Sequence, residues 1–266
     1  MRRAAALGIG FVCMAVAQAA ELRVSFVACP QLRDTTPNCW SAQYGGETYF
    51  IGAQRGPNDS YLPQMKHQVL VEGVVTREPR ICGGVVLKPL RVSVLPELDL
   101  RCDGPILPAD GLTPPVLPPR GTTTSAATAS PPSEVLGPVG SFMRTPVPQP
   151  PYTNREFRID FDFGTDILTD QMQRRVIEIL TYGATAQAKQ YVIRGYPAAT
   201  LLSNGQRLAE AATLGEQRAK KVADIFANLG APRDKLRVEW SSEIEAPDGR
   251  DDAARRRVTV AVMLQR

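Results

Sequence analysis

Residues 215–232 read GEQRAKKVADIFANLGAP and form the most regular stretch of the chain. Apolar or small side chains recur there three and four positions apart, the spacing that places them on one face of an α-helix. Gly230 follows the last apolar residue and Pro232 comes next but one, an arrangement typical of a helix C-terminus. The pattern predicts a helix from about Leu208 to Leu229, with an apolar stripe formed by Leu208, Ala211, Gly215, Ala219, Val222, Phe226 and Leu229.

Arg218 lies inside this apolar stripe, one turn after Leu214 and one turn before Val222. A lone buried guanidinium is unfavourable, so the head group must meet an anion, a set of carbonyl groups or the surface. One interpretation has its stem lying on apolar neighbours while its head reaches water or pairs with an internal acid. The other has the guanidinium fork facing the carboxylate of a ligand. The stripe alone does not decide between them.

Four other segments of the C-terminal half alternate apolar and polar residues, as half-buried strands do: 155–164, 190–196, 235–240 and 256–264. In the first of them, one face carries Phe157, Ile159, Phe161 and Phe163. Thr169 is placed to cap a helix that follows this strand. The order predicts an α+β domain of βαβαββ type over residues 154–266, with its helices on one face of a mixed sheet.

The same alternation puts Asp160 and Asp162 opposite the phenylalanines, so we expect both carboxylates to face solvent. The chain has one histidine, His67, and it contains neither a Gly-x-Ser-x-Gly motif nor a phosphate-binding Gly-x-x-x-x-Gly-Lys motif. We therefore expect no enzyme activity, no cofactor and no metal site.

The first 19 residues combine two arginines, a short apolar run and Ala17-Gln18-Ala19, the pattern of a secretory signal peptide. The apolar run is short for a membrane-spanning helix, which needs roughly 20 residues. We predict cleavage after Ala19 and export through the membrane, with a retained anchor as the alternative.

Four cysteines remain after the signal peptide, Cys29, Cys39, Cys82 and Cys102, and an even number in an exported chain favours disulfides. Four cysteines allow three pairings, and the sequence leaves the choice open. All four belong to residues 20–104, where β-branched and aromatic residues between Gly and Pro breaks predict a small all-β domain. Its expected strands are LRVSFVAC, ETYFIGA, HQVLVEGVV, RICGGVVL and LRVSVLPEL, with an OB-like barrel as one option. Its aromatic residues Trp40, Tyr44, Tyr49 and Tyr61 suit a core better than a binding face.

Residues 105–153 hold 13 of the 23 prolines, together with many Thr, Ser and Ala residues. Such a segment forms neither helix nor central strand, so we predict an extended linker that sets the distance between two folded units. The net charge of +4 is spread along the chain without a basic block, which argues against nucleic acid as a partner.

The segments FDFGTDILT (161–169), GEQRAKKVADIFANLGAP and RRRVTVAVM (255–263) together resemble the OmpA-like (OmpA/MotB C-terminal) domain family. The resemblance covers residues 154–266 and rests on an LxxxRA element, Leu214, Arg218 and Ala219, and on the terminal Arg256-Arg257-Val258. Members of this family are envelope modules that hold peptidoglycan non-covalently and are usually tethered to the outer membrane.

The resemblance implies a site with two charged arms, an aspartate after the second strand and an arginine in the following helix. These arms would hold the ammonium and the carboxylate of a diaminopimelate residue. Arg218 stands at the place of the arginine, but Ala198 stands at the place of the aspartate, in Gly195-Tyr196-Pro197-Ala198. The connection to Arg218 is longer than the family's, and Glu210, its nearest acid, is not favoured as a substitute.

Two further residues complete the expected peptidoglycan site. Tyr196 ends a strand at the mouth of the site, where it would stack on a sugar or peptide or serve packing. Arg256 and Arg257 face opposite sides of a strand, so at most one of them can face the site, and we assign Arg257. The alternative is that residues 255–257 are an ordinary solvated start of the strand.

Our first hypothesis is an exported, non-catalytic, periplasmic cell-envelope protein that binds peptidoglycan, contacts an envelope protein through the β domain and is peripheral to the outer membrane. The alternative is a protein-interaction scaffold whose OmpA-like domain has lost peptidoglycan binding. A third reading makes the β domain a ligand-capturing barrel.

Overall fold

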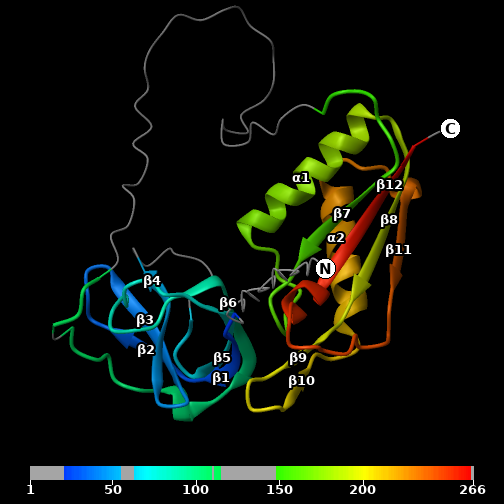
Figure 1. Ribbon diagram of the computed structural model, residues 1–266. Coiled ribbons are helices and arrows are strands. Elements are labelled where there is room, and N and C mark those ends of the chain that lie inside the picture. The colour runs from blue at the N-terminus through cyan, green and yellow to red at the C-terminus, as the bar shows by residue number, and fades with distance from the viewer. Residues whose placement is uncertain (1–20, 55–62, 110, 115–147, 265–266) are drawn as a thin grey trace, which may run out of the picture.

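The computed structural model describes residues 21–54, 63–109, 111–114 and 148–264. The predicted signal peptide, Tyr61 and most of the predicted linker lie outside these residues. The described chain forms a β domain followed by a mixed α/β domain, and the two are in contact (Figure 1). Within the described ranges, no helix has the length and hydropathy that a membrane crossing requires.

The β domain contains two three-stranded antiparallel sheets. One sheet has the order β1-β5-β6 and consists of Arg23–Ala28, His67–Val75 and Leu87–Leu98. The other has the order β2-β3-β4 and consists of Pro30–Arg33, Asn38–Tyr44 and Glu47–Gln54. A short 3-10 helix, η1 (Leu100–Cys102), follows β6. The expected all-β domain is confirmed at this level, whereas the OB-like option stays a prediction.

Two disulfides join the elements of this domain, Cys29–Cys102 and Cys39–Cys82. The structure thus confirms the expected bridges and selects one of the three pairings. Trp40 and Tyr49 are buried in the core between the sheets, in agreement with the packing role favoured for these aromatics.

The predicted strand RICGGVVL is wrong. Cys82 and Gly83 have φ angles of 49° and 75°, which an extended strand does not accommodate, and only single bridges form at Ile81 and Val85. Strands β2 and β3 were not expected, because prolines punctuate their sequence. Pro30 is tolerated because it is the first residue of an edge strand.

The second domain follows the predicted βαβαββ order, with one addition. Its four-stranded sheet has the order β11-β8-β12-β7 and consists of Leu236–Trp240, Ala188–Tyr196, Arg257–Leu264 and Arg155–Asp160. Strands β8 and β11 are parallel, whereas β12 is antiparallel to both of its neighbours. The sheet is therefore mixed, as predicted. Short 3-10 helices lie before β11 (η2, Arg233–Lys235) and before β12 (η3, Asp252–Arg255).

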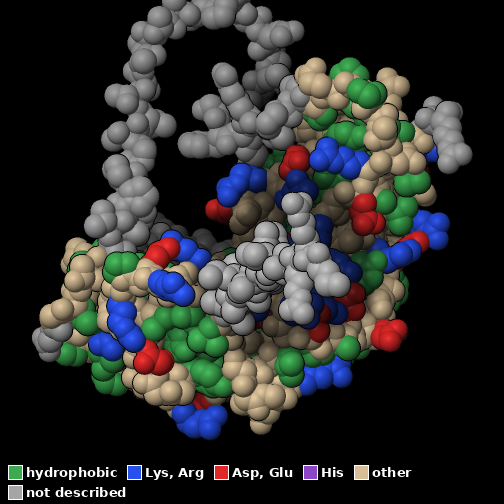
Figure 2. Space-filling view, in the orientation of Figure 1, with side chains coloured by type: hydrophobic (Ala, Val, Ile, Leu, Met, Phe, Trp, Pro, Cys, Tyr) green, Lys and Arg blue, Asp and Glu red, His purple; other side chains and the backbone are tan. Residues whose placement is uncertain are grey.

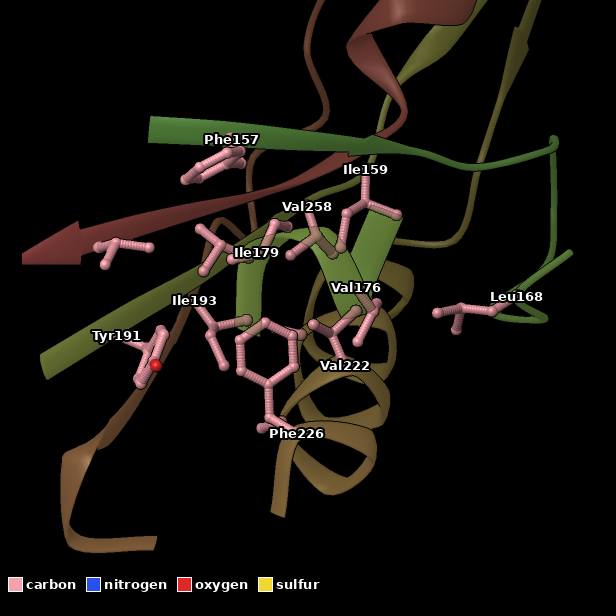
Figure 3. Packing of buried hydrophobic residues seen from close by; sticks show 14 of the residues in the cluster. Phe157, Ile159, Leu168, Val176, Ile179, Tyr191, Ile193, Val222, Phe226 and Val258 are labelled. Carbon is pink, nitrogen blue, oxygen red and sulfur yellow. The ribbon is translucent and has the colours of Figure 1, made fainter. Parts of the chain in front are cut away.

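Helices α1 (Asp170–Thr185) and α2 (Leu214–Asn228) both pack on one face of this sheet (Figure 1). The alternation of the strands puts their branched and aromatic side chains on that face, where they meet the apolar stripes of both helices (Figure 3). Thr169 caps α1 as expected, since its side chain accepts a hydrogen bond from the Met172 amide. The helix α2 ends at Asn228, close to the end at Leu229 that Gly230 predicted.

The beginning of α2 differs from the prediction. The helix starts at Leu214, and Leu208 belongs to a two-stranded hairpin, β9 (Ala199–Leu201) with β10 (Arg207–Ala209). The Asn204-Gly205 pair between two short apolar runs is a hairpin signal that the helical periodicity concealed.

The β domain packs directly against the second domain. Leu70 and Leu95 from one side form a buried apolar cluster with Phe163 and Leu202 from the other. The hairpin β9–β10 lies beside β1, and Ser25 and Ser203 exchange two hydrogen bonds of 2.8 and 2.7 Å (Figure 1). The two units are therefore in direct contact, and the linker predicted over residues 105–153, most of which lies outside the described residues, stays a prediction.

Charged side chains of both signs are interspersed over the visible face of both domains (Figure 2). This agrees with the even distribution of charge along the sequence.

Candidate functional site

Arg218 is completely buried near the start of α2, with 0% of its side chain exposed. Its Nη1 and Nη2 atoms donate to the two carboxylate oxygens of Glu210, at 2.9 and 2.6 Å. The remaining bonds go to the backbone: Nε to Thr165 O at 2.9 Å, Nη2 to Asp162 O at 3.0 Å and Nη1 to Tyr196 O at 3.3 Å. A guanidinium has five N–H donors. Every donor of Arg218 is thus used inside the protein.

Glu210 is also completely enclosed, and each of its oxygens accepts two hydrogen bonds. Oε1 accepts from Arg218 and from the Gly164 amide, and Oε2 accepts from Arg218 and from the Ala198 amide. The pair therefore binds three backbone carbonyls and two backbone amides, which come from the loop after β7 and the loop after β8. An ion pair that satisfies five buried backbone groups is integral to how these two loops fold.

This arrangement bears directly on the site that the resemblance implies. Ala198, at the place of the family aspartate, is itself buried, and its amide binds Glu210. The Glu210 carboxylate occupies the guanidinium fork that the resemblance assigns to a ligand carboxylate. Of the two interpretations of Arg218, the geometry favours pairing with an internal acid.

Tyr196 and Arg257 are cross-strand neighbours on the face of the sheet that the helices leave open. The Arg257 guanidinium lies 4.5 Å from the centre of the Tyr196 ring, and 21% of its side chain is exposed. Its Nη1 also donates to Glu245 at 2.7 Å, and this hydrogen bond raises the pKa of Arg257. The structure thus brings Tyr196 and Arg257 together, but only the backbone carbonyl of Tyr196 contacts Arg218.

Arg256 directly precedes β12 and is completely buried, whereas Arg257 is partly exposed. Arg256 lies at the contact between the domains, where both of its Nη atoms bind the Glu72 carboxylate of β5. Thr200 accepts a hydrogen bond from Arg256 at 2.7 Å and donates one to Glu72 at 3.2 Å. The β domain therefore supplies the counter-charge for an arginine of the second domain.

Asp162 departs from the expectation that it faces solvent. It is partly buried between the domains, and this burial raises its pKa despite the opposing effects of Arg256, Arg91 and Arg218. Asp162 lies in the loop after β7, where the β domain packs, and Arg91 and Glu72 of that domain are among the charges that act on it. Asp160 is half-buried and pairs with Arg158.

Glu210 and Glu72 were not expected as partners of the two buried arginines. In the continuous helix that we predicted, Glu210 and Arg218 would be about 12 Å apart along the axis and would not meet. The observed hairpin and turn before α2 bring them together. Glu72 carried no local signal, because its partner Arg256 lies in the other domain.

The described residues contain no group of three or more His, Cys, Asp or Glu side chains arranged to hold a metal ion. The site consists of the buried Arg218–Glu210 ion pair in the interior and the stacked Tyr196–Arg257 pair on the open face of the sheet.

No protein-family model matches the sequence, and no curated protein sequence matches it either. Among solved structures, the OmpA-like domain of FopA1 from Francisella tularensis subsp. tularensis SCHU S4 is 16% identical, with 40% of this chain and 70% of that chain covered and a TM-score of 0.30. The periplasmic domain of Helicobacter pylori MotB is 16% identical, with 42% and 84% covered and a TM-score of 0.29. A further MotB periplasmic domain (residues 64–256) is 13% identical, with 52% and 91% covered and a TM-score of 0.29. All three TM-scores lie below 0.5, so these likenesses carry no argument about the family, ligands or partners of this chain.

Proposed function

We propose that this chain is an exported, non-catalytic module of the cell envelope that acts as an interaction scaffold built on an OmpA-like domain. The observation that carries the proposal is the closed Arg218–Glu210 pair, which occupies the fork that the resemblance assigns to diaminopimelate. We place the protein in the periplasm, peripheral to the outer membrane, with a protein partner at the β domain.

A ligand carboxylate could reach Arg218 only by displacing Glu210. That exchange would leave the Gly164 and Ala198 amides without their acceptor and would leave a buried carboxylate without its counter-charge. Each of these changes is unfavourable in a protein interior. The ammonium of diaminopimelate would find Ala198 where the resemblance requires an aspartate. Both arms of the two-arm site are therefore missing as binding groups.

The test is co-sedimentation of residues 20–266 with purified sacculi, beside a protein known to bind sacculi. We expect the wild-type chain to stay in the supernatant. Arg218→Lys provides the comparison, because it keeps the charge but cannot form the bidentate fork. Pelleting of the wild type that is lost in Arg218→Lys, while circular dichroism shows that the variant is folded, would refute the scaffold and restore Arg218 as a ligand arm.

A second candidate function, peptidoglycan binding through the open face of the sheet, is favoured by the Tyr196–Arg257 pair. An aromatic ring beside a partly exposed guanidinium offers both stacking and a charged donor to a sugar or peptide. Pelleting that survives Arg218→Lys but is lost in Tyr196→Ala and in Arg257→Ala would select this function. Arg233→Ala is the control, since Arg233 is an exposed arginine of η2 whose ion pair with Asp224 involves neither Tyr196 nor Arg257.

A further inference from the structure

The β domain contacts the same two segments that enclose Arg218. In the loop after β7, the backbone of Asp162, Gly164 and Thr165 binds the Arg218–Glu210 pair. In the same loop, the Phe163 side chain enters the apolar cluster with Leu70 and Leu95, and its amide donates to Ser93 Oγ at 2.9 Å.

The segment after β8 is shared in the same way. Tyr196 and Ala198 bind the Arg218–Glu210 pair through their backbone. Two to five residues later, Thr200 binds Glu72 and Ser203 binds Ser25 of the β domain. The pair is thus enclosed by two loops whose outer sides are attached to another domain.

We propose that the β domain is an intramolecular cover that holds the two loops in place around the Arg218–Glu210 pair, and that separation of the domains loosens the pair. The inference goes beyond the proposed function, because it assigns the β domain a structural role at the pair that fills the guanidinium fork. The contacts of Ser25, Glu72 and Ser93 with the second domain are called the interdomain clamp below.

Solvent reaches one end of the interdomain clamp, where separation of the two domains can begin. A cleft of about 450 Å³ opens between the domains and is lined by Ser25, Glu72, Thr200, Ser203 and Asp252, among others. Glu72 keeps 11% of its side chain exposed, whereas Arg256 keeps 1%. Solvent therefore reaches the acidic side of the ion pair, and separation of the domains would hydrate it first.

The experiment compares hydrogen exchange in the full mature chain between the wild type and Glu72→Arg/Leu95→Arg, with detection by NMR. Both substitutions lie in the β domain, where they place a positive charge against Arg256 and inside the shared apolar cluster. We expect the Gly164 and Ala198 amides and the Arg218 Nε–H to exchange at least about tenfold faster in the variant. The amides of Val258 and Val260 in the central strand should stay protected and show that the second domain is folded.

The control variant is Glu47→Arg/Leu98→Arg, which makes the same changes at exposed positions of the β domain. It should leave all these exchange rates unchanged. Small-angle X-ray scattering reports whether the domains separate. Separation without faster exchange at Gly164 and Ala198 would overturn the proposal, because the pair would then close by itself. Domains that stay together in Glu72→Arg/Leu95→Arg would overturn it too, because the contacts of Glu72 and Leu95 would then not be what attaches the β domain to the second domain. Sacculus binding by the wild type would contradict the proposed function without altering this exchange comparison, so the two failures are distinguishable.

Discussion

Glu210→Gln changes one atom of the most enclosed charged pair in the described structure. Each carboxylate oxygen accepts one bond from Arg218 and one from a backbone amide. Whichever oxygen becomes an NH₂ group, one guanidinium N–H and one backbone N–H lose their acceptor and face another donor. An unsatisfied buried donor costs about 1–3 kcal/mol. Breaking a buried ion pair from one side costs about 3–5 kcal/mol, and this value includes the lost bonds.

We therefore expect Glu210→Gln to lower the free energy of unfolding of the second domain by about 3–5 kcal/mol. Urea unfolding followed by the helical circular dichroism signal measures this domain, because both α-helices of the described chain belong to it. Glu216→Gln is the matched control: it removes an exposed ion pair with Lys220 on the same helix and should cost at most about 0.5 kcal/mol.

Replacement of both partners sharpens this prediction. Many buried ion pairs are replaced by apolar residues with little loss of stability. Here, Glu210→Leu/Arg218→Met would leave the carbonyls of Asp162, Thr165 and Tyr196 and two amides without partners, so we expect the double variant to remain clearly destabilised. A Glu210→Gln midpoint close to that of Glu216→Gln, or a double variant as stable as the wild type, would refute the role assigned to the pair.

Three further predictions follow from single features of the structure. Burial raises the pKa of Asp162, so the folded state binds the proton of this carboxyl more tightly than the unfolded state does. The free energy of unfolding therefore falls as the pH rises from the unfolded-state pKa through the raised folded-state pKa. Asp162→Asn should flatten this fall, as measured by urea midpoints across acid pH. Cys39→Ala/Cys82→Ala removes a disulfide between residues 43 positions apart and should lower the free energy of unfolding of the β domain by about 4 kcal/mol. The fluorescence of the buried Trp40 follows this unfolding, and an unchanged urea midpoint would show that the bridge is dispensable. A Cβ at Gly195 would lie 1.9 Å from Gly215 O of α2, so Gly195→Ala should cost about 3 kcal/mol or more by the helical unfolding signal, whereas a wild-type midpoint would contradict the close approach.

Much of the architecture followed from residue patterns alone. Alternation in four segments, the stripe of residues 215–229 and the Thr169 cap predicted the mixed sheet and its two helices, because burial of one face repeats with the period of each element. The even number of cysteines predicted disulfides, and the stripe identified Arg218 as the residue that needed an explanation. These properties depend on neighbours within a few positions.

The partners of the buried charges depended on the tertiary structure. Arg218 binds carbonyls at positions 162 and 165, more than fifty residues earlier in the chain, and Arg256 binds Glu72 across the domain contact. The periodicity of a sequence does not indicate which distant loop will cover a guanidinium group. An arginine in an apolar stripe has the same local sequence pattern whether it binds a ligand or an internal acid. The pattern thus showed that Arg218 must have a partner, whereas the fold of two loops around a hairpin determined that the partner is Glu210.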